Sequence, residues 1–200
     1  MAAPLEFYFD FSSPYGYVAA TKIDALGAKY GRTVNWHPIL LGVVFKTTGG
    51  KPLPFLPLKG AYAARDFVRT ARFFGVDMTI PATFPISTQV ASRAFYWAAG
   101  QDLARAKALA LALLGAFFAH GRDISKAEIV GDVAAEQGWD RAALLAAVET
   151  PEVKDRLRRE TDGAIEKGVF GSPYVIVDGE PFWGVDRLDQ VERWLKDGPW

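Results

Sequence analysis

The sequence contains no cysteine among its 200 residues. This absence excludes disulfide bonds, zinc or iron–sulfur sites with cysteine ligands, and a dithiol redox centre made by the chain itself. Histidine is also scarce, since His37 and His120 are the only two. We assign both of them structural roles, because two distant histidines do not suit a catalytic zinc site and no Gly-x-Ser-x-Gly pattern accompanies them. We therefore expect neither a metal site nor a Ser-His-Asp triad.

The sequence also lacks an excess of charge and a long apolar run. Its 23 basic and 23 acidic residues give a formal net charge of zero, whereas nucleic-acid binding needs a basic surface. The longest uncharged apolar run, residues 108–119, is shorter than the about 20 residues that span a bilayer. The first residues lack the basic stretch of a secretory signal. We expect a cytoplasmic protein that binds neither nucleic acid nor membrane.

The N-terminal segment has the pattern of a strand, a helix and a second strand. Apolar and polar residues alternate from Leu5 to Phe11, which is the period of a β-strand. Residues 17–26 then have helical spacing, and residues 33–40 have the pattern of another strand. Two strands joined through a helix normally pair in parallel through a right-handed crossover.

The middle of the chain is predicted to be irregular at first and then helical. Residues 46–60 contain three prolines and a Gly49-Gly50 pair, which favours a loop. From residue 61 to about residue 168 the spacing is helical, with almost no strand signal. Ser125 and Glu128 have the spacing of a capping box, and Asp140 is a predicted N-cap. The predicted helices cover residues 62–74, 88–99, 103–119, 125–137, 141–148 and 152–167.

Strand patterns return near the C-terminus. Residues 174–177 and 181–183 flank Asp178-Gly179, which predicts a β-hairpin, and residues 186–195 have helical spacing. Because neither strand-bearing end could close a sheet alone, we predict one α/β layer interrupted by helices. The predicted parts are a discontinuous unit of residues 1–45 and 168–200, and a connecting loop with a helical insertion of residues 46–167.

Ser13-Pro14 lies between the first predicted strand and its helix. Proline is favoured at the first helical position and serine at the N-cap, so Ser13 is predicted to cap this helix. The same helix end presents unpaired N–H groups and a partial positive charge, which suit an anion. From this motif alone, Ser13 could serve only as a helix cap, or it could be both a cap and part of an anion site.

A second serine–proline motif, Gly171-Ser172-Pro173, precedes the last two predicted strands. X–Pro bonds are cis in only about 5–6% of cases, so this motif alone does not predict a cis bond. The order of the elements and the two motifs nevertheless resembles the thioredoxin fold, in which a Cys-x-x-Cys pair begins the helix and a cis-proline loop faces it. Here Ser13-Pro14-Tyr15-Gly16 would occupy those four positions without a cysteine.

The resemblance becomes specific in four segments that follow one another along the chain. They are Phe7-Tyr8-Phe9-Asp10-Phe11-x-Ser13-Pro14-Tyr15, Lys59-x-x-Tyr62-x-x-x-Asp66-x-x-Arg69, Phe170-Gly171-x-Pro173 and Trp183-Gly184-x-Asp186-Arg187-Leu188. On these segments the whole chain resembles the kappa-class glutathione transferase family, and within it the bacterial 2-hydroxychromene-2-carboxylate isomerases. The resemblance implies a thioredoxin-like α/β fold with a large all-helical insertion, glutathione as the cofactor, and a homodimer.

The resemblance also implies a set of glutathione-binding residues. Ser13 matches the serine that hydrogen-bonds the glutathione sulfur, and Ser172 matches the residue whose backbone pairs with the cysteinyl part. Val185 and Asp186 match the pair that holds the γ-glutamyl end, with Arg187 beside them.

Four further positions complete the implied site. Lys59 matches a lysine near the glutathione carboxylates. Gly50 stands where the family commonly has asparagine, so only its backbone or the neighbouring Lys51 could make that contact. Lys46 and Phe84 fall where the isomerases contact the organic substrate, although a solvated surface lysine is an equally good reading of Lys46.

For function, the resemblance implies the interconversion of 2-hydroxychromene-2-carboxylate and trans-o-hydroxybenzylidenepyruvate, a step of aromatic (naphthalene-type) degradation. Glutathione and a small aromatic carboxylate would be the partners. A kappa-like transferase or peroxidase that acts on other electrophiles is the alternative within enzymes. A non-catalytic thioredoxin-like module is the alternative outside them, and Ser13, Lys59 and Asp186 argue against it.

Overall fold

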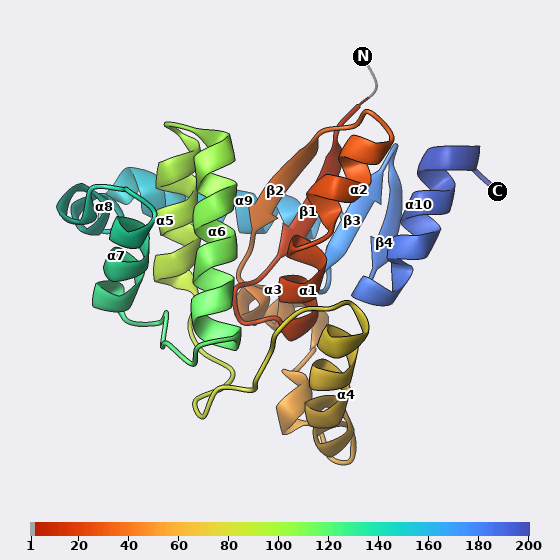
Figure 1. Cartoon of the computed structure of the whole chain (residues 1–200), viewed down its shortest axis with the longest axis horizontal. Helices are drawn as coiled ribbons and strands as arrows, with labels where there is room; N and C mark the ends of the chain where they lie inside the picture. The colour runs from red at the N-terminus through yellow and green to blue at the C-terminus, as the bar shows by residue number, and fades with distance from the viewer. Residues whose placement is uncertain (1–2) are drawn as a thin grey trace.

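A four-stranded mixed sheet forms the centre of the molecule (Figure 1). The computed structural model describes residues 3–200, so the first two residues of the predicted 1–45 segment lie outside it. The strand order is β2-β1-β3-β4, with β1 parallel to β2 and antiparallel to β3, and β3 antiparallel to β4. The strands are β1 (Leu5–Phe9), β2 (Val34–Pro38), β3 (Tyr174–Val177) and β4 (Glu180–Trp183).

The predicted β-helix-β unit is confirmed, because β1 and β2 pair in parallel. The connection contains two short helices, α1 (Pro14–Ala20) and α2 (Ile23–Lys29), where the sequence pattern predicted one. The predicted hairpin is also confirmed. Its turn residues Asp178 and Gly179 have φ values of 52° and 90°, as the favoured two-residue hairpin turns require. The short 3₁₀ helix η2 (Val185–Arg187) and α10 (Leu188–Asp197) follow.

The two faces of the sheet bury different side chains, because successive residues of a strand point to opposite sides. Phe7 and Phe9 of β1 lie in the main core with Val18 of α1. Tyr8 lies on the other face, in a smaller core with Ala164. Figure 1 shows α1 and α2 in front of the sheet and α9 behind it.

The segment between β2 and β3 is helical, and the described residues contain no strand there. Its helices from residue 59 onwards agree with the predicted positions. They are α4 (Lys59–Phe73), α5 (Gln89–Ala99), α6 (Leu103–Phe118), α7 (Ala127–Glu136), α8 (Arg141–Ala147) and α9 (Pro151–Glu166). Helix α9 covers the sheet although it belongs to the predicted insertion. The division into residues 1–45 with 168–200 and residues 46–167 stays a proposal.

One local prediction holds only in part and another was wrong. The predicted loop at residues 46–60 contains the end of helix α3 (Leu41–Thr48) and the 3₁₀ turn η1 (Leu53–Phe55). The start of α3 is stabilised from another element, since the Leu41 N–H donates to Oδ2 of Asp10 at 2.8 Å. The predicted capping box is absent, because α7 begins after Lys126 and the Ser125 hydroxyl donates to Asp123 instead.

Within residues 3–200, no helix combines the length and the apolar character that crossing a membrane requires.

Candidate active site

Ser13 lies at the junction of β1 and α1 and is the N-cap of α1, as predicted. The Gly16 N–H donates to the Ser13 Oγ at 3.0 Å, and Pro14 occupies the first turn. Ser13 is only 5% exposed, so its hydroxyl lies at the edge of the protein interior rather than in bulk water. The cap therefore also places a hydroxyl group at a shielded helix N-terminus.

The Ser172-Pro173 loop lies directly against this helix end. The Ser13 hydroxyl donates to the backbone carbonyl of Ser172 at 3.0 Å, across 159 positions of sequence. The peptide bond between Ser172 and Pro173 is cis. The Ser172 Oγ in turn accepts a hydrogen bond from the Asp10 N–H at 3.0 Å. These contacts bring together the two serine–proline motifs that sequence analysis singled out.

Gly16 completes this arrangement because there is no room for a side chain at its position. A Cβ atom on Gly16 would lie 2.7 Å from the Ser172 Oγ and 3.0 Å from the Ser13 Cβ. Both distances are too short for ordinary packing. In a dithiol motif the second cysteine would stand at the position of Gly16. Here Ser172 lies so close to Gly16 that a side chain does not fit without a shift.

Asp10 is a positioning residue that the sequence analysis missed. Its carboxylate is buried and accepts hydrogen bonds from the N–H groups of Ser12 at 2.7 Å and Leu41 at 2.8 Å. Burial raises the pKa of Asp10, while the hydrogen bonds from Ser12, Leu41 and Thr88 act in the opposite direction. The available signal was one acidic residue between Phe9 and Phe11, immediately after β1.

Tyr15, two residues after Ser13, connects α1 to α4. Its hydroxyl donates to Asp66, which also accepts from Tyr62 at 3.3 Å and pairs with Arg69. Burial and the hydrogen bond to Asp66 both raise the pKa of Tyr15. Burial tends to raise the pKa of Asp66, but the hydrogen bonds from Tyr15 and Arg69 outweigh it and leave this pKa below its usual value. The second family segment thus forms a charged network beside the Ser13 helix.

Lys59 is the first residue of α4 and is exposed. It lies on the helix that Asp66 connects to Tyr15. The preceding residue, Leu58, has a left-handed φ of 63°. The structure therefore places Lys59 at the solvent-facing start of the helix that borders the site.

Phe84 is brought to the same side of the molecule by the segment between α4 and α5. Its ring lies 6.0 Å from the Phe67 ring, which is itself 5.0 Å from the Tyr15 ring. The next residues are held in place because the Ile86 N–H donates to the Ser12 Oγ at 3.1 Å. Phe84 thus belongs to an aromatic wall that extends from Tyr15.

The segment that contains Val185, Asp186 and Arg187 is fixed to the cis-proline loop. The Gly184 N–H donates to the Pro173 carbonyl at 3.0 Å, immediately before η2. Val185 is buried, whereas Asp186 and Arg187 are exposed and form an ion pair at 3.2 Å.

Lys46 and Gly50 are not joined by hydrogen bonds to the residues around Ser13 in the described part of the chain. Both are exposed near the end of α3. A Cβ atom on Gly50 would lie 2.7 Å from the Phe45 ring, so an asparagine there would require this ring to move. Among the described residues, no group of three or more His, Asp or Glu side chains could hold a metal ion.

Comparisons with known proteins agree with this architecture. The family model for the DSBA-like thioredoxin domain matches residues 4–196. The 2-hydroxychromene-2-carboxylate isomerase of Sphingobium xenophagum is 32% identical over 200 residues, which cover 98% of this chain and 100% of the relative. The glutathione S-transferase kappa 2 of Caenorhabditis elegans is 28% identical over 209 residues, which cover 96% of this chain and 92% of the relative. A solved 2-hydroxychromene-2-carboxylate isomerase superposes with a TM-score of 0.87 at 29% identity, covering 96% of this chain and 94% of that chain.

Proposed function

Because this chain belongs to the DSBA-like thioredoxin domain family, in the group with 2-hydroxychromene-2-carboxylate isomerases and kappa-class glutathione transferases, we propose that it is a glutathione-dependent isomerase. Its substrates would be 2-hydroxychromene-2-carboxylate and trans-o-hydroxybenzylidenepyruvate. The observation that carries this proposal is the buried Ser13 hydroxyl, which caps α1 and contacts Ser172 in a site without cysteine.

The reaction needs a sulfur nucleophile that the chain does not contain. A free thiol has a pKa of about 8.5, so only a few per cent is thiolate at neutral pH. Lowering this pKa by about two units requires about 2.7 kcal/mol of preferential stabilisation of the thiolate. A hydrogen bond to a charged group supplies about 1.5–3 kcal/mol and a partly buried helix N-terminus up to about 2 kcal/mol. Ser13 and the start of α1 are therefore sufficient without a histidine base.

Ser13 has to change its hydrogen-bond acceptor when glutathione binds. Its oxygen already accepts from the Gly16 N–H, and its proton is donated to the Ser172 carbonyl. A peptide N–H from the cysteinyl part of glutathione would take over the Ser172 carbonyl. The Ser13 proton is then free to be donated to the sulfur.

The ends of glutathione would be held by groups around this centre. We assign the γ-glutamyl end to Val185, Asp186 and Arg187, which the Gly184–Pro173 hydrogen bond keeps beside the cis-proline loop. We assign a carboxylate to Lys59 and a further contact to the Gly50 backbone or, alternatively, to the Lys51 side chain.

For the organic substrate, Phe84 would supply an aromatic wall and Lys46 a cation for the carboxylate. Bound glutathione would supply a thiolate that adds reversibly to the conjugated carbon, allows rotation about the resulting single bond and then leaves unchanged. The protein residues would orient the two molecules and stabilise the thiolate through Ser13.

A kappa-like transferase or peroxidase is the second candidate function, because kappa-class transferases are among the relatives. Both functions use the same thiolate and differ only in the electrophile. The homodimer and the cytoplasmic location stay predictions.

The proposal is tested by following the absorbance change of the isomer interconversion with and without glutathione. We expect catalysis only with glutathione, and recovery of all glutathione as free thiol at the end. Consumption of the thiol with other electrophiles, without isomerisation, would favour the transferase. If millimolar glutathione neither accelerates turnover nor raises the melting temperature, the site does not bind it and the proposal is wrong.

A further inference from the structure

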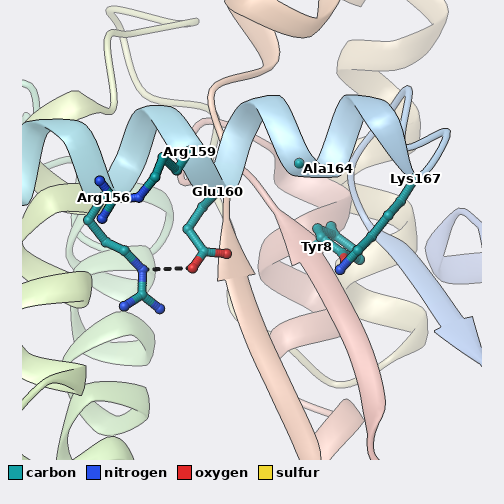
Figure 2. Close-up of a pocket in the computed structure, with 7 residues that line it drawn as sticks. Tyr8, Arg156, Arg159, Glu160, Ala164 and Lys167 are labelled. Carbon is teal, nitrogen blue, oxygen red and sulfur yellow. Dashed lines mark hydrogen bonds and ion pairs between the residues drawn. The ribbon is translucent and has the colours of Figure 1, made fainter.

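A cavity of about 390 Å³ lies beside α9, and Ser13 is not among the residues that line it. It borders the smaller core, since its lining residues Tyr8 and Ala164 belong to that core. Figure 2 shows the side chains that surround it, most of which project from α9. Gly163 and Ala164 form part of the lining, and their small size leaves space along this part of the helix.

The lining of the cavity is strongly cationic. Arg156 and Arg159 lie at one end, and Lys167 lies at the other (Figure 2). Glu160 is the only carboxylate in the lining, and both of its oxygens have partners. Its Oε1 accepts from the Arg156 Nε at 2.7 Å, and its Oε2 lies 3.1 Å from the His37 Nδ1. Three cations thus face one carboxylate that is already engaged.

Hydrogen-bond donors are also in surplus. The Tyr8 side chain is buried, with 1% of the residue exposed, and its oxygen accepts from the Lys167 Nζ at 3.3 Å. Within residues 3–200, the hydroxyl proton of Tyr8 has no acceptor, Arg159 has no hydrogen bond or ion pair, and Lys167 has no carboxylate partner. Of these groups only Tyr8 is buried, whereas Arg159 and Lys167 are exposed and can be hydrated. A buried hydroxyl is nearly always paired, so the Tyr8 proton, with the unpaired cations beside it, suits a ligand that supplies acceptors.

We propose that this cavity binds a small organic dianion of the dicarboxylate class. One carboxylate would lie against Arg156 and Arg159, whose guanidinium groups suit bidentate carboxylate binding. The other would accept hydrogen bonds from the Tyr8 hydroxyl and the Lys167 ammonium. Residues 159 and 167 are about 12 Å apart along the helix axis. The Lys167 side chain extends from its helix position towards Tyr8 (Figure 2), so the ligand would need a short carbon chain between its two carboxylates to reach both ends of the cavity.

This site is separate from the proposed glutathione site. None of its lining residues belongs to the group around Ser13 and Ser172. The dianion should therefore bind with the same affinity whether or not glutathione is present. The failure of either proposal leaves the other unaffected.

The test is calorimetric titration of the full chain with adipate, and with hexanoate as a six-carbon ligand that carries one carboxylate. We expect adipate to bind more tightly than hexanoate, and Arg159→Met and Lys167→Met each to weaken adipate binding by about tenfold or more. Tyr8→Phe keeps the aromatic ring that stacks on His37 and removes only the hydroxyl. We expect it to weaken adipate binding severalfold.

Arg158→Met is the matched control, because Arg158 lies on α9 outside the cavity lining and pairs with Asp155. It makes the same change of charge and should leave adipate affinity unchanged. Absence of adipate binding at millimolar concentration would overturn the proposal. An equal loss of affinity in Arg158→Met and Arg159→Met, or competition by glutathione, would also overturn it.

Discussion

The hydroxyl of Ser13 and the backbone carbonyl of Ser172 lie 3.0 Å apart, with Ser13 as the donor. The same hydroxyl oxygen accepts from the Gly16 N–H. Both hydrogen-bonding roles of Ser13 are thus filled within the protein, and one of them is directed to a carbonyl that a peptide-like ligand could occupy. In the proposed function, a thiol ligand that takes the Ser172 carbonyl would release the Ser13 proton for its own sulfur, and binding would then be coupled to thiolate stabilisation.

The first prediction concerns the contact between Gly16 and Ser172. Gly16→Ala places a Cβ atom 2.7 Å from the Ser172 Oγ. Either the Ser172 side chain must rotate, which breaks its hydrogen bond with the Asp10 N–H, or the loop must move away from α1. We expect glutathione affinity to fall by about tenfold or more. Calorimetric titration with glutathione measures this change.

Gly42→Ala is the control for this prediction. Gly42 lies in α3, and a Cβ atom there would meet nothing within 4 Å. Alanine in place of glycine in an open helical position normally stabilises a protein. Equal glutathione affinities for wild type and Gly16→Ala would show that Gly16 tolerates a side chain and that the close approach has no role in binding.

The second prediction concerns the hydrogen bond from Tyr15 to Asp66, which connects α1 and α4. Tyr15→Phe keeps the edge contact with Phe67 and removes the donor to a charged acceptor. We expect a loss of about 1.5–3 kcal/mol in the free energy of unfolding, measured by urea denaturation.

Tyr62→Phe is the comparison for Tyr15. Tyr62 donates to the same carboxylate at 3.3 Å but is 62% exposed, so water can replace its hydrogen bond. We expect a change of less than about 0.5 kcal/mol. If the two variants lose equal stability, the shielding of the Tyr15 contact contributes nothing.

The third prediction concerns His37, which lies between Glu6 and Glu160 at 2.6 Å and 3.1 Å. Burial alone would lower the pKa of His37, but the two carboxylates outweigh it and hold this pKa above its usual value of 6.5. Protonated His37 therefore stabilises the fold fully below pH 6.5, and this contribution is lost as the pH rises through the folded-state pKa. We therefore expect the free energy of unfolding to fall as the pH rises above 6.5.

The contact between His37 and Glu160 also makes the free energy of unfolding depend on pH in acid, where stability falls as the pH falls. The hydrogen bond with His37, which outweighs burial, lowers the pKa of Glu160 from 4.5 to about 2. The stabilisation by Glu160 is therefore present above pH 4.5 and lost as the pH falls towards 2. His37→Gln should remove most of the alkaline decline, whereas His120→Gln, which changes an exposed histidine, should retain it. Parallel declines in wild type and His37→Gln would mean that other groups cause the pH dependence.

Much of the fold followed from local patterns in the sequence. The alternation at Leu5–Phe9 and the Asp178-Gly179 turn each contain enough information to define their own strand or hairpin. The start of α3 could not be predicted in this way, because its N-terminal N–H is satisfied by Asp10 from a distant part of the chain. A tertiary cap of this kind leaves no pattern next to the helix it stabilises.

The site was predictable only in part, for the same reason. The Ser13 cap was evident from Ser13-Pro14, but the facing carbonyl of Ser172 and its cis bond depend on tertiary contacts. The positioning roles of Asp10 and Tyr15 also depend on partners that the fold brings close.

The most direct test of the central claim is the pH midpoint at which bound glutathione becomes a thiolate, followed by its ultraviolet absorbance. We expect a wild-type midpoint about two units below the 8.5 of a free thiol, and a midpoint at least about one unit higher in Ser13→Ala. Ser12→Ala should keep the wild-type midpoint, because the Ser12 hydroxyl accepts from the Ile86 N–H instead. A midpoint that is identical in wild type and Ser13→Ala would contradict the account, since Ser13 would then be only a helix cap.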